Sequence, residues 1–120
     1  MSYICFKDLN VLKEILTVPW HTKLIAIYVW LLVRYSNDKL IITSAYRAGD
    51  TGVHGTNPLR AFDLRSTVFD NAMDVCDDIN NNWTYDSMRK SKLVAMIHDI
   101  GQGIHFHIQI HSNTTYGRIA

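Results

Sequence analysis

The segment Ile104–His111 alternates apolar and polar side chains without exception. This period of two predicts a strand, because successive side chains of a strand point to opposite faces of its sheet. The core-facing positions would be Ile104, Phe106, Ile108 and Ile110, and the opposite face would carry His105, His107, Gln109 and His111. Same-face neighbours lie about 7 Å apart, so one imidazole can bind a metal while the next reaches a metal-bound water or a substrate. The alternative is that these polar side chains only face solvent and bind no metal.

A metal site could be completed by two other residues, His54 and Asp63, which precede this segment in the chain. His54 lies in a polar loop, and Asp63 lies inside a mostly apolar run. A carboxylate there is costly to bury unless it is paired or coordinates a cation. Pairing with Arg47 or Arg65 is one possibility. Two imidazoles and one carboxylate would instead make a three-ligand zinc site with a fourth position for water, which is the catalytic form of zinc.

Two helices are expected before these residues. A short helix spans Leu9–Leu16, and Pro19 suits the first turn of a longer helix over Trp20–Tyr35. The longer segment is apolar around most of its circumference, which predicts a buried helix at the centre of the domain.

Strands and a third helix must then position the candidate ligands. The strand patterns cover Lys39–Tyr46, Leu59–Arg65, Leu93–His98 and Ile104–His111. Arg47–Pro58 is a polar loop, and apolar residues at helical spacing predict a helix over Ser66–Asn80, capped by Ser66 or Thr67. A turn at Gly101-Gln102-Gly103 would join the last two strands as an antiparallel hairpin. The expected fold class is α+β, with helices packed on one face of a small antiparallel sheet, in one domain over residues 1–120.

Composition argues against several classes of protein. The chain has 120 residues, a net charge of +1 and scattered basic side chains, which offers no basic patch for nucleic acid. Its most apolar segment, Leu24–Val33, is about half as long as a membrane span requires. The N-terminus lacks the pattern of a signal peptide, so the chain is expected to be made in a cytoplasm without its own export signal. Cys5 and Cys76 form no Cys-x-x-Cys pair, and Cys76 is expected to be a buried free thiol, which fits a reducing compartment.

Four short motifs follow one another in a particular order. They are Thr43-Ser44-Ala45-Tyr46-Arg47, Gly52-Val53-His54-Gly55, Arg60-Ala61-Phe62-Asp63-Leu64-Arg65 and His105-Phe106-His107. This ordered set resembles the motifs of the LAS metallopeptidases, which include the D-Ala-D-Ala metallopeptidases and the penicillin-insensitive murein endopeptidases. Their pattern is a Ser-x-Tyr-Arg strand end, a His and an Asp a short loop apart, and a late His-x-His. The resemblance covers residues 39–111 and is strongest to small phage-encoded proteins of the D-Ala-D-Ala type.

The resemblance implies a ligand set and two catalytic groups. His54, Asp63 and His107 would bind a zinc ion. His105 would lie beside the metal-bound water and act as the base. Arg47 would bind a substrate carboxylate or polarise the scissile carbonyl.

Four more polar side chains are implied as contacts to the ligands or the substrate. Ser44 and Tyr46 belong to the strand-end motif that also contains the arginine. Gln109 or His111 would orient a ligand or touch the substrate, and the choice between these two stays open.

The chain departs from the family pattern in two respects. The interval from His54 to Asp63 is nine residues, which is longer than the family usually shows, and a loop between them can absorb the difference. Many members use a Glu three residues before the last ligand as the base. Position 104 here is Ile, and Glu14 is the single glutamate of the chain. The base is therefore expected to be His105, as in members that rely on His-x-His.

The activity implied by the resemblance is zinc-dependent hydrolysis of an amide bond in peptidoglycan stem or cross-link peptides. Such a protein would act on the cell wall after its release from the cytoplasm, or as a virion-associated component. Two alternatives stay open. One is a zinc-binding but catalytically inactive domain of the same fold, with a phage structural or partner-binding role. The other is a non-haem iron site, which also uses two histidines and one carboxylate.

Overall fold

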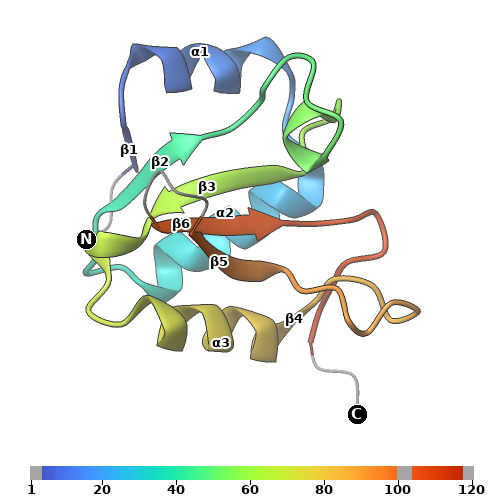
Figure 1. Cartoon of the computed structure of the whole chain (residues 1–120). Coiled ribbons are helices and arrows are strands. Elements are labelled where there is room, and N and C mark those ends of the chain that lie inside the picture. Colours follow the sequence, from blue (N-terminus) through green and yellow to red (C-terminus); the bar gives the residue numbers. More distant parts are fainter. Residues whose placement is uncertain (1–3, 100–103, 118–120) are drawn as a thin grey trace.

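A five-stranded sheet forms the centre of the protein, whose structure, a computed structural model, describes residues 4–99 and 104–117 (Figure 1). The predicted turn at Gly101-Gln102-Gly103 lies outside the described residues. The strand order is β1-β2-β3-β6-β5. The strands are β1 (Ile4–Phe6), β2 (Leu40–Ser44), β3 (Ala61–Arg65), β5 (Ala95–Asp99) and β6 (Ile104–Gln109).

The four strands that the sequence predicts pair antiparallel with one another, as expected. The sequence analysis did not predict β1, which pairs parallel with β2 and makes the sheet mixed. The register between β3 and β6 places Asp63 opposite His107 and Arg65 opposite His105. On the other side of β6, β5 places His98 opposite His105. The sheet therefore brings chemistry-bearing residues of three strands to one place.

Three helices and a small second sheet complete the α+β fold that the sequence predicts. The helices are α1 (Leu9–Thr17), α2 (Thr22–Arg34) and α3 (Ala72–Asn82), and β4 (Trp83–Thr84) pairs with β7 (Thr115–Tyr116). Short 3₁₀ turns are η1 (Val53–Gly55) and η2 (Ser66–Val68). In Figure 1, α2 crosses behind the sheet, α1 lies beside β1 and β2, and α3 lies beside β5.

The main core lies between α2 and the sheet. Leu24, Ile27 and Leu31 of α2 are fully buried together with Phe62 of β3 and Phe106 of β6. Burial of these side chains stabilises the fold by about 1.5–3 kcal/mol each. The apolar alternation of β3 and β6 thus presses one face of the sheet onto α2, and the other face is left for the polar residues.

Exposure corrects two expectations about apolar residues. The sequence predicts that α2 is buried around most of its circumference, but Ile25, Val29 and Val33 form an exposed stripe, because the sheet covers only one side of the helix. Ile104 was expected to face the core with Phe106, yet it is 58% exposed because it begins its strand at the margin of the sheet.

The predicted start of the third helix is also wrong. Ser66 and Thr67 lie in the 3₁₀ turn η2, and α3 begins only at Ala72. The Asn71 side chain accepts hydrogen bonds from the backbone N–H groups of Met73 and Asp74, which is the pattern of an N-cap. A better cap five residues downstream therefore displaces the helix start.

Two further expectations concern the thiols and the membrane. Cys5 and Cys76 are both free, and burial raises the pKa of the Cys76 thiol, as expected for a buried cysteine. Within residues 4–99 and 104–117, no helix is both long and apolar enough to cross a membrane.

Candidate metal centre

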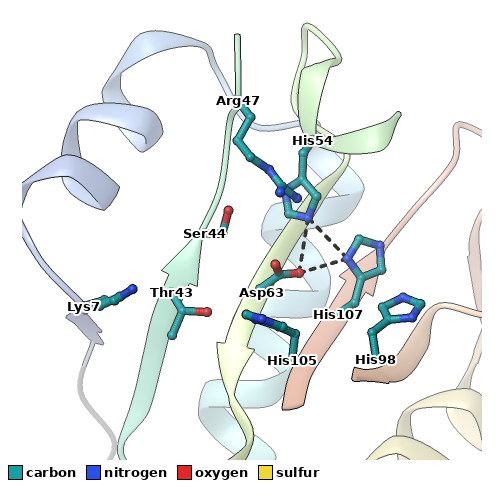
Figure 2. Close-up of a pocket in the computed structure, with 9 residues that line it drawn as sticks. All are labelled: Lys7, Thr43, Ser44, Arg47, His54, Asp63, His98, His105 and His107. Atoms are coloured by element: carbon teal, nitrogen blue, oxygen red, sulfur yellow. Dashed lines mark hydrogen bonds and ion pairs between the residues drawn. The ribbon is translucent and has the colours of Figure 1, made fainter. Parts of the chain in front are cut away.

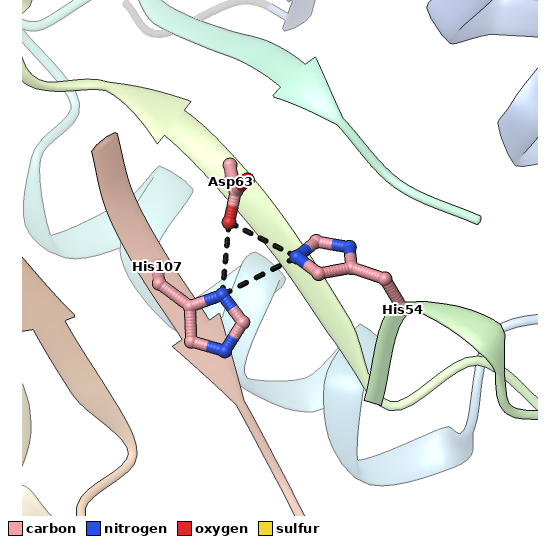
Figure 3. Close-up of side chains that lie close together, drawn as sticks. All are labelled: His54, Asp63 and His107. Atoms are coloured by element: carbon pink, nitrogen blue, oxygen red, sulfur yellow. Dashed lines mark hydrogen bonds and ion pairs between the residues drawn. The ribbon is translucent and has the colours of Figure 1, made fainter. Parts of the chain in front are cut away.

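Three side chains from three different elements meet on the polar face of the sheet. His54 comes from η1, Asp63 from β3 and His107 from β6, and all three are buried. His54 Nε2 lies 3.2 Å from Asp63 Oδ1, His107 Nδ1 lies 2.9 Å from the same oxygen, and the two nitrogens are 3.3 Å apart (Figure 3). The ligand set implied by the resemblance is thus assembled in space.

The loop before β3 holds His54 in place. The Nδ1–H group of His54 donates a hydrogen bond to the Ala45 carbonyl over 2.6 Å, because a carbonyl can only accept. The backbone N–H of Arg47 donates in turn to the His54 carbonyl at 2.7 Å. The Nε2 atom is thereby the nitrogen of His54 that faces the cluster.

The long interval between His54 and Asp63 is taken up by a folded loop. The Thr56 hydroxyl donates to the Val53 carbonyl at 2.9 Å and accepts from the Arg60 backbone N–H at 3.0 Å. These bonds close the loop at the start of β3, so the additional residues do not move His54 away from Asp63.

Gln109 orients the second imidazole. Its amide N–H donates to the Leu93 carbonyl at 3.0 Å, which turns its Oε1 atom toward His107 Nε2 at 3.1 Å. An amide oxygen can only accept, so Nε2 of His107 carries a proton, and Nδ1 is the nitrogen that faces the cluster. Gln109 and His111 were the two candidates for orienting a metal ligand, and Gln109 is the one that contacts an imidazole of the cluster.

The geometry of the cluster fits a tetrahedral metal ion. Ligand atoms about 2.0–2.1 Å from a zinc ion at tetrahedral angles are about 3.3 Å apart. The three distances between the candidate ligand atoms are 2.9, 3.2 and 3.3 Å. Metal-binding histidines almost always donate their other ring N–H to an acceptor, as both imidazoles here do. Within the described residues, one group of side chains could hold a metal ion together, and it consists of His54, Asp63 and His107.

The electrostatics of Asp63 agree with this arrangement. Burial alone would raise the pKa of the carboxyl, but hydrogen bonds from His107 and His54 and the charge of both imidazoles outweigh it. The pKa of Asp63 therefore lies well below its usual range, and the group is a carboxylate at neutral pH. Among the described residues, its ion-pair partners are the two imidazoles and neither Arg47 nor Arg65, the partners that the alternative required.

A hollow of about 310 Å³ opens over the cluster (Figure 2). Beside the three candidate ligands it is lined by Lys7, Thr43, Ser44, Arg47, His98 and His105. None of these lining residues belongs to an α-helix, so a molecule can approach the cluster from this face of the sheet. The lining thus includes three residues that were expected at the site, namely His105, Arg47 and Ser44.

His105 and His98 flank the cluster on one side. His105 is partly buried, and its Nε2 atom is shielded from solvent without a hydrogen-bond partner among the described residues. His98 is exposed, and its ring centroid lies 5.5 Å from that of His107. The sequence analysis predicts His98 at the end of a strand and gives it no role at the site. The register of β5 against β6 places His98 opposite His105, and the sequence, which predicts the hairpin, does not give this register.

Arg47 is exposed at the other side of the hollow, with its Nε atom 3.6 Å from Asp50 Oδ2. Tyr46, expected to contact ligands or substrate, packs against the hydrophobic core instead. His111 also lies elsewhere, because the chain leaves the strand after Gln109. Its Nδ1 atom is 3.9 Å from Asp86 Oδ2, and its ring packs against Tyr85.

Comparison of the chain with protein-family models, with curated proteins and with solved structures finds no match in any of the three. The assignment of the site therefore rests on the residues themselves. Two imidazoles and a carboxylate with 3.3 Å or less between their facing atoms form a candidate metal centre.

Proposed function

We propose that the protein is a zinc-dependent hydrolase that cleaves an amide bond in peptidoglycan stem or cross-link peptides. The observation that carries the proposal is the convergence of His54 Nε2, Asp63 Oδ1 and His107 Nδ1, with the opposite ring nitrogen of each histidine bound to an acceptor. The resemblance of the ordered motifs to LAS metallopeptidases supports zinc over iron and an amide over other bonds.

These three residues would hold the zinc ion, which would supply a Lewis acid for activating water and polarising the scissile carbonyl. The residues around it must then move one proton from the attacking water to the leaving amine. His105 is the proposed base and acid, because the residue lines the hollow and its Nε2 atom has no hydrogen-bond partner among the described residues. His98 lies opposite His105 in the sheet and would relay or stabilise the transferred proton.

Arg47 is proposed to bind the negative charge that the substrate carries or develops. A guanidinium matches a carboxylate with two parallel hydrogen bonds, and it also stabilises an oxyanion. The side chain is exposed and only loosely paired with Asp50, so it is free to turn toward a substrate. Ser44 lines the same hollow and offers a hydroxyl for a further contact.

An inactive zinc-binding domain is the second candidate, and one observation favours it. Glu14, the only glutamate of the chain, accepts a hydrogen bond from the Ala45 backbone N–H at 3.3 Å and does not line the hollow. Catalysis therefore depends on imidazoles alone. If these do not transfer protons, the same site would serve a phage structural or partner-binding role.

The function is tested with purified cell walls. Wild-type protein loaded with zinc is expected to reduce the turbidity of a peptidoglycan suspension and to release new amino groups. His105→Ala should lower the rate at least about 100-fold, the usual contribution of a general base, with its zinc content unchanged. His111→Ala is the matched control and should keep the wild-type rate.

Release of amino groups by wild type and His105→Ala at equal rates would remove His105 from the mechanism. No release by zinc-loaded wild type from walls of several cross-link types would favour the inactive domain. Activity on walls would also fit action after release from the cytoplasm or from a virion.

A further inference from the structure

A second hollow of about 200 Å³ adjoins the one over the metal cluster. It is lined by Lys7, Thr43, Leu64, Arg65, Ile104 and His105. Lys7, Thr43 and His105 line both hollows, so the two form one trough. Figure 2 shows these three residues on the side of the cluster away from Arg47.

The second hollow is positively charged. Its lining includes the Lys7 ammonium and the Arg65 guanidinium, and it includes no carboxylate. Within the part of the chain that the structure describes, neither cation forms an ion pair, whereas Arg34, Arg47 and Arg89 each do. Two uncompensated cations around a concave surface attract an anionic group, and the walls of a hollow strengthen that field.

The lining also contains a buried hydroxyl, that of Thr43 in β2, the strand between β1 and β3. Lys7 follows β1, and Arg65 ends β3. Thr43 Oγ1 is shielded from solvent and has no hydrogen-bond partner among the described residues. An unpartnered buried polar group costs free energy, because it has lost its bonds to water and gained none in the protein. A bound acceptor such as a carboxylate oxygen would remove this cost, while the ammonium and the guanidinium balance its charge.

The strand register sets the distance of this anion from the reacting bond. Arg65 and Asp63 are two residues apart on one face of β3, opposite His105 and His107 of β6. Two residues of a strand span about 7 Å, and an extended peptide laid along the trough advances by the same amount for every two residues. An anion held at Arg65 therefore belongs to a residue about two positions from the amide that lies at the cluster.

We propose that Lys7, Thr43 and Arg65 form an anion subsite for a substrate carboxylate about two residues from the scissile amide. The inference rests on the proposed peptide hydrolysis and narrows the substrate to an acidic peptide. Arg47 and the subsite contact the peptide on opposite sides of the metal cluster. A substrate that reaches both is held in register across the site.

The test compares two synthetic stem peptides that differ in one group, a glutamate two residues from the scissile amide or a glutamine in its place. Binding to the zinc-loaded protein is measured by calorimetry, and kcat/KM by release of amino groups. The glutamate peptide is expected to bind about tenfold more tightly, a difference of about 1.4 kcal/mol.

Lys7→Gln and Arg65→Gln should each bring the ratio of the two affinities close to unity, with zinc content unchanged. Lys90→Gln removes an exposed lysine that lines none of these hollows and is the matched control, which should keep the wild-type ratio. All three are surface changes, and circular dichroism checks that each variant is folded.

The outcomes separate the subsite from the hydrolysis that it serves. Tighter binding of the glutamate peptide without turnover would support the subsite and contradict the proposed hydrolysis. Turnover of both peptides at equal kcat/KM would support hydrolysis and overturn the subsite. Equal affinities in the wild type, no binding of either peptide, or a preference that survives in Lys7→Gln and Arg65→Gln would also overturn it.

Discussion

The proton positions of the two imidazoles follow from their hydrogen-bond acceptors. Ala45 O keeps a proton on Nδ1 of His54, and Gln109 Oε1 keeps one on Nε2 of His107. The two histidines thus present different ring nitrogens to Asp63. These acceptors prepare the site before a metal arrives, so their loss should weaken metal binding without removing any ligand.

Substitution of Gln109 tests whether these hydrogen-bond acceptors prepare the site for a metal ion. Gln109→Ala is expected to raise the Kd for zinc about 10- to 100-fold, the usual effect of losing a residue that orients a metal ligand. Competition with a chromophoric chelator measures the change. Gln109→Glu retains the acceptor and should restore most of the affinity, and His111→Ala should leave it unchanged. Equal Kd values for Gln109→Ala and the wild type would contradict the role of Gln109.

The carboxylate of Asp63 makes the metal-free protein sensitive to acid. Its pKa in the folded protein lies below the ordinary value of 3.8, so the unfolded chain binds the proton more readily. The stabilisation is therefore fully present above about pH 4 and is lost as the pH falls below it. Urea unfolding should show a steeper loss of stability between pH 5 and pH 3 for the wild type than for Asp63→Asn. Asp78 and Asp86 also have lowered pKa values, but both proteins share them. Parallel curves would contradict the prediction.

The loop that carries His54 depends on a close approach between two backbone segments. A Cβ atom at Gly55 would lie 1.8 Å from the Asp50 carbonyl oxygen, closer than any real contact. Gly55→Ala must therefore shift η1 and should cost about 1–3 kcal/mol of stability and at least about tenfold in zinc affinity. Thermal unfolding and chelator competition measure both effects.

Gly52→Ala is the matched control for the loop. The added Cβ would meet only the Asp50 side-chain oxygen at 3.2 Å, which can turn away. Its stability and zinc affinity should stay near those of the wild type. An undisturbed Gly55→Ala protein, or equal losses in both variants, would show that the close approach is not what positions His54.

Helix α3 and strand β5 are joined by one side chain. Asn80 accepts from the backbone N–H groups of Val94 and Ala95 and donates to the Ala95 carbonyl at 2.8 Å. Asn80→Ala leaves these backbone groups unpaired at the edge of the sheet and should lower the free energy of unfolding by about 2 kcal/mol. Chemical denaturation measures it, with the exposed Asp77→Ala as a control. A loss below about 0.5 kcal/mol would contradict this account of the edge.

Elements with strong periodicity could be predicted from the sequence, and elements fixed by tertiary contacts could not. The alternation of Ile104–His111 correctly predicts a strand with Phe106 and Ile108 buried. Strand β1 has three residues and forms only because β2 offers it a parallel edge. The start of α3 depended on the competition between two caps, which Asn71 wins over Ser66.

Part of the candidate site could also be predicted from the sequence, and part depended on tertiary contacts. His54, Asp63 and His107 could be proposed from motif order, and the structure brings their ligand atoms together. Tyr46 and His111 share motifs with site residues but point elsewhere, because the chain bends after β2 and leaves the sheet after β6. Cross-strand neighbours such as His98 and Arg65 become visible only when the register of the sheet is known.

At the scale of the whole molecule, three elements far apart in the sequence each contribute one ligand. A metal bound by η1, β3 and β6 must therefore stabilise the entire fold, since the unfolded chain cannot present the three together. Zinc at about 100 times its Kd should stabilise the protein by about 2.7 kcal/mol and raise its melting temperature. Scanning calorimetry with zinc and with a chelator measures the shift. A melting temperature that zinc leaves unchanged would contradict the site.

The most direct test of the account is the metal content of the purified protein, wild type beside His107→Ala, after incubation with zinc and removal of the excess. About one zinc ion per chain is expected in the wild type, as for a single three-ligand site. His107→Ala should retain almost none, and His111→Ala should match the wild type. Wild-type protein without zinc after this incubation, or His107→Ala with as much zinc as the wild type, would contradict the metal centre formed by His54, Asp63 and His107.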